Sequence, residues 1–182
     1  MILFINACVR KGSRTKKLAN GVLSHLNEQY EEVRLEDIAF PVVNEEFLYS
    51  RDKLIGEGRF DDPSFALARQ FADADEIVIA APFWDLSFPA SLKQYFEQIN
   101  VVGVTFVYTE EGFPKGLCRA KELNYVTTAG GSYVPEEFGF GYVKALAQGF
   151  YGIPEARLVQ AVGLDLMGAD PERILAEAME RV

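Results

Sequence analysis

The chain of 182 residues is poor in the side chains that bind transition metals or form disulfides. It has two cysteines and one histidine. Cys8 and Cys118 are far apart and belong to no C-x-x-C pair, and His25 lies one position off the apolar face of a helical pattern. These counts argue against a disulfide framework and a zinc site. We expect no bound metal and assign His25 no catalytic role.

Long apolar runs and clusters of positive charge are also missing. The longest apolar stretches, such as residues 77 to 83, are far shorter than the roughly 20 residues that cross a bilayer. The formal net charge of -9 repels nucleic-acid phosphates and anionic lipid. We therefore expect no membrane segment and no nucleic-acid partner. Since no basic and apolar leader is present, we expect a cytoplasmic protein.

Predicted strands and helices alternate along a chain that is 49% apolar, enough for one core. Short apolar or alternating segments predict strands, and helices are predicted from apolar spacing of three or four residues and from Ser, Asp and Pro at helix starts. The predicted strands are residues 2–7, 31–36, 76–82, 122–128 and 157–164. Helices follow residues 13–15, 61–63, 87–89 and 170–171, and another covers 141–151. This order predicts a single domain, 1–182, with an α/β flavodoxin-like fold: a five-stranded parallel sheet of order 2-1-3-4-5 with helices on both faces.

Two segments interrupt the alternation. Residues 37 to 58 have no clean period and read as a long loop, which is either a functional cover or a solvated insertion. Thr105 to Thr109 followed by Gly112 and Pro114 predicts a small hairpin insertion between a helix and the fourth strand. We expect this hairpin beside the functional site, where it would shape a pocket or a dimer contact; a surface ribbon is the alternative.

The loop after the first strand contains groups that suit a phosphate monoester. Ser13 and Thr15 provide hydroxyls, Gly12 allows a tight turn, and Arg10 and Arg14 are close by. Free amides at a helix start favour an anion, and guanidinium groups add hydrogen bonds to it. Taken alone, the loop is equally consistent with ordinary helix capping.

The loops after the third and fourth strands rise at the same edge of such a sheet. Residues 82–88 bring three aromatic side chains and a leucine to a strand exit, where a planar ring can pack on them. Gly130 and Gly131 follow the fourth strand and let backbone amides approach a ligand, for instance the edge of a flavin that gains negative charge on reduction. The three loops together indicate FMN.

The sequence resembles the NAD(P)H-dependent FMN azoreductase and quinone reductase family. The motifs that carry the resemblance run the full length of the chain. They are Ser13–Thr15 followed by Leu18, Pro82–Leu86 with Pro89, Leu92 and Lys93, the segment Gly103–Tyr108 (GVTFVY) with Gly112 and Gly116-Leu117, and Gly130-Gly131. Of these, G-x-T-F-x-Y is the most specific.

The resemblance implies an FMN site, with NADH or NADPH as donor and a quinone-like or azo-like small molecule as acceptor. Ser13, Arg14 and Thr15 would hold the phosphate with Arg10 nearby. The flavin ring would be lined by Pro82, Phe83, Trp84, Asp85 and Leu86, and its polar edge would meet Thr128, Ala129, Gly130 and Gly131. The family is commonly homodimeric with its site at the interface, so a homodimer is implied.

The second loop departs from the family pattern, which has Asn after the aromatic residue where this chain has Asp85. A carboxylate facing the ring would disfavour the anionic reduced flavin. No catalytic acid is assigned, because the flavin carries out the chemistry. Tyr133 is a candidate hydrogen-bond donor to flavin or acceptor, and a packed aromatic residue is the alternative.

Two other functions fit parts of the sequence. A flavodoxin-type electron carrier has the same fold, and an acidic charge suits docking to basic partners. A low-molecular-weight tyrosine phosphatase or arsenate-reductase-like enzyme would use Cys8 and Arg14, which match C-x5-R-[ST]. The phosphatase reading leaves the second and third loops unexplained.

Overall fold

The computed structural model describes residues 1–181 and contains a five-stranded parallel sheet of order β2-β1-β3-β6-β7. In chain order this is 2-1-3-4-5, so the predicted flavodoxin-like topology is confirmed. The strands are β1 (Ile2–Asn6), β2 (Tyr30–Arg34), β3 (Glu76–Ala80), β6 (Glu122–Thr128) and β7 (Glu155–Ala161). β2 is an edge strand, as its alternating pattern indicated, whereas the apolar runs of β1 and β3 lie in the middle of the sheet.

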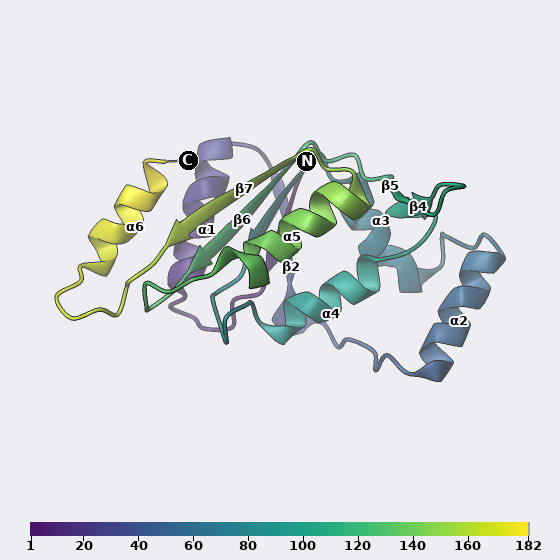
Figure 1. The fold of residues 1–182 in the computed structure, drawn as a ribbon, viewed down its shortest axis with the longest axis horizontal. Helices are drawn as coiled ribbons and strands as arrows, with labels where there is room; N and C mark the ends of the chain where they lie inside the picture. The colour runs from purple at the N-terminus through teal and green to yellow at the C-terminus, as the bar shows by residue number, and fades with distance from the viewer. Residues whose placement is uncertain (182) are drawn as a thin grey trace.

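Helices cover both faces of the sheet (Figure 1). Alternate side chains of β1 enter different cores: Ile2 and Phe4 pack under one layer, and Leu3 and Ile5 pack under the other. The first layer contains α1 (Arg14–Leu26) and α6 (Pro171–Met179). The second contains α3 (Ala66–Asp73), α4 (Ala90–Ile99) and α5 (Phe140–Leu146), which continues into a π-helical turn over Ala147–Tyr151. No helix within residues 1–181 is long and apolar enough to cross a membrane.

The predicted capping residues begin the first and last helices. Ser13 caps α1, its Oγ accepting a hydrogen bond from the amide of Lys16, and Asp170 caps α6 through the amide of Arg173. Thr15, the other candidate cap, lies inside α1 instead. The fifth strand is displaced from its prediction: it runs from Glu155 to Ala161 and is followed by Gly163, whose φ of 76° a strand does not accommodate.

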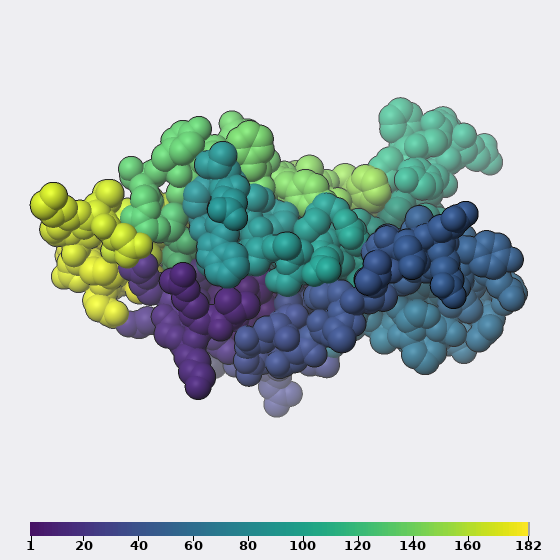
Figure 2. All heavy atoms as spheres, turned by 90° about the horizontal axis from the view of Figure 1, so that it is seen from below, coloured from purple at the N-terminus to yellow at the C-terminus, as the bar shows by residue number. Residues whose placement is uncertain are grey.

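The prediction of a loop over residues 37–58 was wrong for its second half. Residues Glu45–Gly56 form helix α2, capped by Asn44, whose side-chain oxygen accepts a hydrogen bond from the amide of Phe47. None of its residues is fully buried. Its inward side, Phe47, Arg51, Leu54 and Ile55, is only half-buried and includes a charged residue, so the apolar period is weak and the sequence pattern did not reveal the helix. α2 lies at the end of the molecule opposite α6 (Figures 1 and 2).

The predicted hairpin is present as β4 (Phe106–Tyr108) and β5 (Pro114–Gly116), which pair antiparallel. Its expected position beside the site was wrong. Gly116 lies so close to the backbone of Tyr151 that an added Cβ would be 2.1 Å from the Tyr151 carbonyl carbon, and the Cys118 amide donates to the Tyr151 carbonyl. These contacts hold the hairpin near the amino ends of the strands, at the same end as α2 (Figure 1).

Candidate functional site

The carboxyl ends of β1, β3 and β6 open into one cleft of about 190 Å³. Its walls are the loops that follow these strands, together with one residue from the loop after β7. The lining residues are Cys8, Val9, Arg10, Gly12, Ser13, Arg14, Thr15, Pro82, Phe83, Trp84, Thr128, Ala129, Gly130 and Asp165. The cleft therefore lies where ligands bind in open parallel sheets.

The first loop presents the start of α1 to the cleft. Ser13 satisfies the amide of Lys16, which leaves the amides of Arg14 and Thr15 in the unbonded first turn of the helix. Thr15 is 1% exposed, and its Oγ1 lies 2.6 Å from Oγ1 of Thr128. This contact joins the first loop to the third. The result is an amide-rich, positively polarised pocket that suits an anion.

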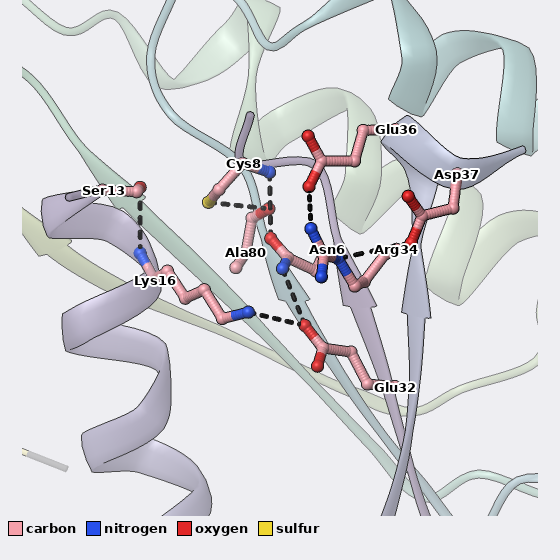
Figure 3. A network of polar contacts seen from close by, with 9 residues as sticks. All are labelled: Asn6, Cys8, Ser13, Lys16, Glu32, Arg34, Glu36, Asp37 and Ala80. Atoms are coloured by element: carbon pink, nitrogen blue, oxygen red, sulfur yellow. Dashed lines mark hydrogen bonds and ion pairs between the residues drawn. The ribbon is translucent and has the colours of Figure 1, made fainter. Parts of the chain in front are cut away.

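A polar network holds the end of β1 in place (Figure 3). The side-chain oxygen of Asn6 accepts the amide proton of Cys8 at 2.9 Å, and its nitrogen donates to Glu32 at 2.8 Å. Lys16 donates to the same Glu32 oxygen at 2.9 Å. Burial would raise the pKa of Glu32, but these hydrogen bonds outweigh it and hold the pKa below its usual value. The network connects β1, β2 and α1 beneath the first loop.

The second loop is a tight turn from Trp84 to Ser87, closed by backbone hydrogen bonds of 3.0 and 2.8 Å between these two residues. Its central residues, Asp85 and Leu86, have φ of 50° and 68°, the left-handed conformation at two consecutive non-glycine positions. The turn leaves the side chains of Trp84 and Leu86 exposed at the rim. The amide of Phe83 donates to the Thr128 carbonyl, so the second loop is tied to the third.

The backbone carbonyls of the third loop accept hydrogen bonds from the segment that follows β7. The amides of Gly163, Leu164 and Asp165 donate to the carbonyls of Gly131, Ala129 and Gly130, respectively. Among residues 1–181, the amides of Gly130 and Gly131 donate to no backbone carbonyl. The loop therefore keeps backbone donors available at the edge of the cleft, as two adjacent glycines suggested.

Ten of the thirteen residues predicted for the site line the cleft. Asp85 and Leu86 lie outside it because the left-handed turn directs them to the surface, and Gly131 lies one position beyond the lining. Tyr133 is 75% exposed and does not line it either. Asp165 was missed. A signal was present, because Asp165 follows the fifth strand and the loop after that strand reaches the same edge of the sheet.

Comparisons with known proteins agree with this architecture. A family model described as the flavodoxin-like fold matches residues 1–182. The chain is 35% identical to an FMN-dependent NADH:quinone oxidoreductase of Clostridium perfringens, over 99% of this chain and 94% of that protein.

The chain belongs to the flavodoxin-like family. A second relative, an FMN-dependent NADH:quinone oxidoreductase of Lachnoclostridium phytofermentans, is also 35% identical over the same shares of both chains. Among solved structures, an azoreductase from Bacillus anthracis has a TM-score of 0.82 at 25% identity, covering 99% of this chain and 95% of that one. An FMN-dependent NADH-azoreductase from the same species, in complex with FMN, has a TM-score of 0.79 at 26% identity, with coverages of 99% and 94%.

Within this flavodoxin-like fold, Cys8 is not placed as a nucleophile. It is 5% exposed, and its sulfur lies 3.8 Å from the carbonyl oxygen of Ala80. Burial raises the pKa of the Cys8 thiol above its usual value, although a hydrogen bond with Ser13 acts in the opposite direction. A reactive cysteine needs the reverse, a stabilised thiolate. The geometry therefore disfavours the phosphatase interpretation of C-x5-R.

Proposed function

We propose that this protein is an FMN-dependent oxidoreductase that takes reducing equivalents from NADH or NADPH and passes them to a quinone-like or azo-like small molecule. The observation that carries the proposal is the convergence of the amide-rich first loop, the aromatic second loop and the Gly130-Gly131 loop on one cleft. The names of the two relatives, FMN-dependent NADH:quinone oxidoreductases, support FMN, an NADH donor and a quinone acceptor.

The residues of the cleft fit FMN. The unbonded amides of Arg14 and Thr15 and the nearby guanidinium of Arg10 would hold its phosphate. A cleft of about 190 Å³ is smaller than the roughly 300–1,000 Å³ of pockets that enclose a whole ligand. It therefore suits the phosphate and its chain, while the ring would lie against the rim formed by Trp84 and Phe83.

When bound, FMN supplies the hydride chemistry. The protein's part is binding and orientation. The Gly130 and Gly131 amides can donate to a developing negative charge at the ring edge. The exposed Trp84 and Leu86 leave the rim open, so that a reduced nicotinamide and an acceptor can use the same space in turn. We assign no protein side chain the role of proton donor.

The decisive experiment is to purify the protein and measure flavin binding and turnover. We expect FMN at near one per chain, tighter binding of FMN than of FAD, and parallel lines in double-reciprocal plots when NADH and a quinone are varied. NADPH is compared with NADH in the same assay. A protein that takes up no FMN would contradict the proposal. A protein that holds FMN but has no turnover with nicotinamide and quinone would be an electron carrier.

We further propose that the protein is a cytoplasmic homodimer. Large apolar side chains are exposed on the hairpin (Tyr108 and Phe113) and around the start of α2 (Val42 and Tyr49), at one end of the molecule. Large apolar side chains left exposed in a single chain are common at subunit interfaces. Sedimentation equilibrium should give twice the chain mass; a monomer at all concentrations would contradict the dimer, and cell fractionation tests the location.

A further inference from the structure

Arg14 reaches from the start of α1 to the loop after β7. Its Nη2 lies 2.8 Å from Oδ1 of Asp165, and its Nη1 donates to the Leu164 carbonyl at 3.3 Å. Both Arg14 and Asp165 line the cleft. The guanidinium that the sequence assigned to phosphate binding is thus already held by a carboxylate from a segment 151 positions further along the chain.

Asp165 lies against the third loop. The backbone amide of Asp165 donates a hydrogen bond to the carbonyl of Gly130 at 2.9 Å. A Cβ added at Gly130 would lie 2.1 Å from Oδ2 of Asp165, closer than any side chain permits. The absence of a side chain at Gly130 is therefore what allows Asp165 to face the cleft, which gives this glycine a second role besides exposing its amide.

The two arginines of the cleft differ in their electrostatic state. Arg14 is paired with Asp165, whereas Arg10 takes part in no ion pair among residues 1–181. A flavin phosphate carries a charge of about -1.5 to -2 at neutral pH. Such a group meets one unpaired cation, Arg10, and one cation whose charge is offset by a neighbouring carboxylate. The positive charge available to the phosphate is lower than the sequence indicates.

We propose that Asp165 limits the affinity of this protein for flavin phosphate. It does so by occupying Arg14 and by placing a negative charge in the cleft that receives the phosphate. This inference rests on the proposed function, because it supposes an FMN site. It adds a determinant of phosphate affinity that lies outside the three loops assigned to the flavin.

The test compares Asp165→Asn with Glu172→Gln in the full-length protein. Glu172 is an exposed carboxylate of α6 that pairs with Lys17 outside the cleft, so its substitution changes the net charge equally. Dissociation constants for FMN and riboflavin are measured by flavin fluorescence. At low salt we expect Asp165→Asn to bind FMN about fivefold more tightly than wild type, with the gain falling as salt screens the charges. Riboflavin, which lacks the phosphate, should bind wild type and variant alike.

A double-mutant cycle tests whether Asp165 acts through Arg14. Arg14→Gln should weaken FMN binding about twofold in the wild-type background but about fivefold in the Asp165→Asn background, since Arg14 is free only there. Arg10→Gln should weaken binding by the same factor in both backgrounds. Asp165→Ala, which removes the charge without adding an amide, should repeat the gain seen with Asp165→Asn.

The outcomes separate this inference from the proposed function. If wild type binds no FMN, the function itself fails. If wild type binds FMN but Asp165→Asn equals Glu172→Gln, or binds FMN more weakly, the inference is overturned. An equal gain for FMN and riboflavin would also overturn it, because the effect would then come from loop shape and not from phosphate charge. Native circular dichroism of each variant establishes that the fold is retained.

Discussion

At the scale of single residues, the second loop contains a conformational cost. Asp85 and Leu86 both have positive φ, the pattern of a type I′ turn, which glycine and asparagine favour. Aspartate tolerates this conformation through local hydrogen bonding, whereas leucine has no such compensation and adopts it at a cost in free energy. The backbone therefore explains why an aspartate can replace the asparagine of the resembling family, and it places Asp85 outside the cleft lining.

Replacing Leu86 with glycine should relieve this strain. We expect Leu86→Gly to raise the free energy of unfolding by about 1 kcal/mol, because a left-handed non-glycine residue costs about that much. Urea unfolding of the flavin-free protein measures it. Asp85→Gly is the matched control and should gain less. A loss of stability in Leu86→Gly would mean that contacts of the leucine side chain outweigh its backbone strain.

Cys8 gives a second test at this scale. Because burial raises the pKa of its thiol, the folded state favours the protonated form. This contribution to stability is fully present below the ordinary thiol pKa and is lost as the pH rises through the folded value. We expect iodoacetamide at pH 8 to label Cys8 far more slowly in the native protein than after unfolding.

Cys8→Ser should keep FMN binding and most reductase turnover, and wild type should not hydrolyse p-nitrophenyl phosphate. Cys118→Ser is the control, since burial also raises the pKa of Cys118, to about 12, away from the cleft. Phosphatase activity in wild type that disappears in Cys8→Ser would favour the phosphatase alternative.

At the scale of elements, β1 and β6 each contain a buried asparagine whose side-chain nitrogen donates hydrogen bonds to glutamate: Asn6 to one carboxylate and Asn124 to two. Asn6 lies at the carboxyl end of β1, where it holds the Cys8 amide and Glu32. Asn124 lies near the amino end of β6, where it bonds to Glu76 and Glu122. The two are 2% and 4% exposed. Their similar burial but opposite positions allow a role in the site to be separated from a role in stability.

We expect Asn6→Ala and Asn124→Ala each to lower the free energy of unfolding by about 1–3 kcal/mol, because buried polar partners lose their hydrogen bonds. Only Asn6→Ala should also weaken FMN binding, since it loosens the first loop. Chemical denaturation and flavin titration of both variants provide the comparison. Equal effects on FMN binding would show that the Asn6 network does not position the cleft.

The whole molecule should respond to FMN as one unit. A ligand at about 100 times its dissociation constant stabilises the folded state by about 2.7 kcal/mol. For a chain of this size that raises Tm by roughly 5–10 °C. We expect this shift with FMN in calorimetry at high ligand concentration, and a single cooperative transition if residues 1–182 form one domain. Two separate transitions, only one of them moved by FMN, would contradict the single domain.

Much of the architecture could be read from local patterns. Apolar alternation and runs predicted the five strands, with β6 matched residue for residue, and capping residues marked the starts of α1 and α6. These features depend on neighbouring residues, and the order in which they follow one another restricts the sheet to few topologies. The residue types that predict a flavin site could also be recognised in the loops after the strands: hydroxyls and glycine in the first loop, aromatic residues in the second, and two glycines in the third.

The features that the sequence did not reveal depend on contacts between distant parts of the chain. Arg14 pairs with Asp165, which lies 151 positions further along the chain. Asp165 can lie next to Gly130 because that position has no side chain. The hairpin lies far from the cleft because Gly116 packs on Tyr151, and the half-buried side of α2 gives only a weak apolar period because it includes Arg51. Local propensity sets each element, but long-range packing decides which charges meet in the cleft and therefore how strongly it attracts a phosphate.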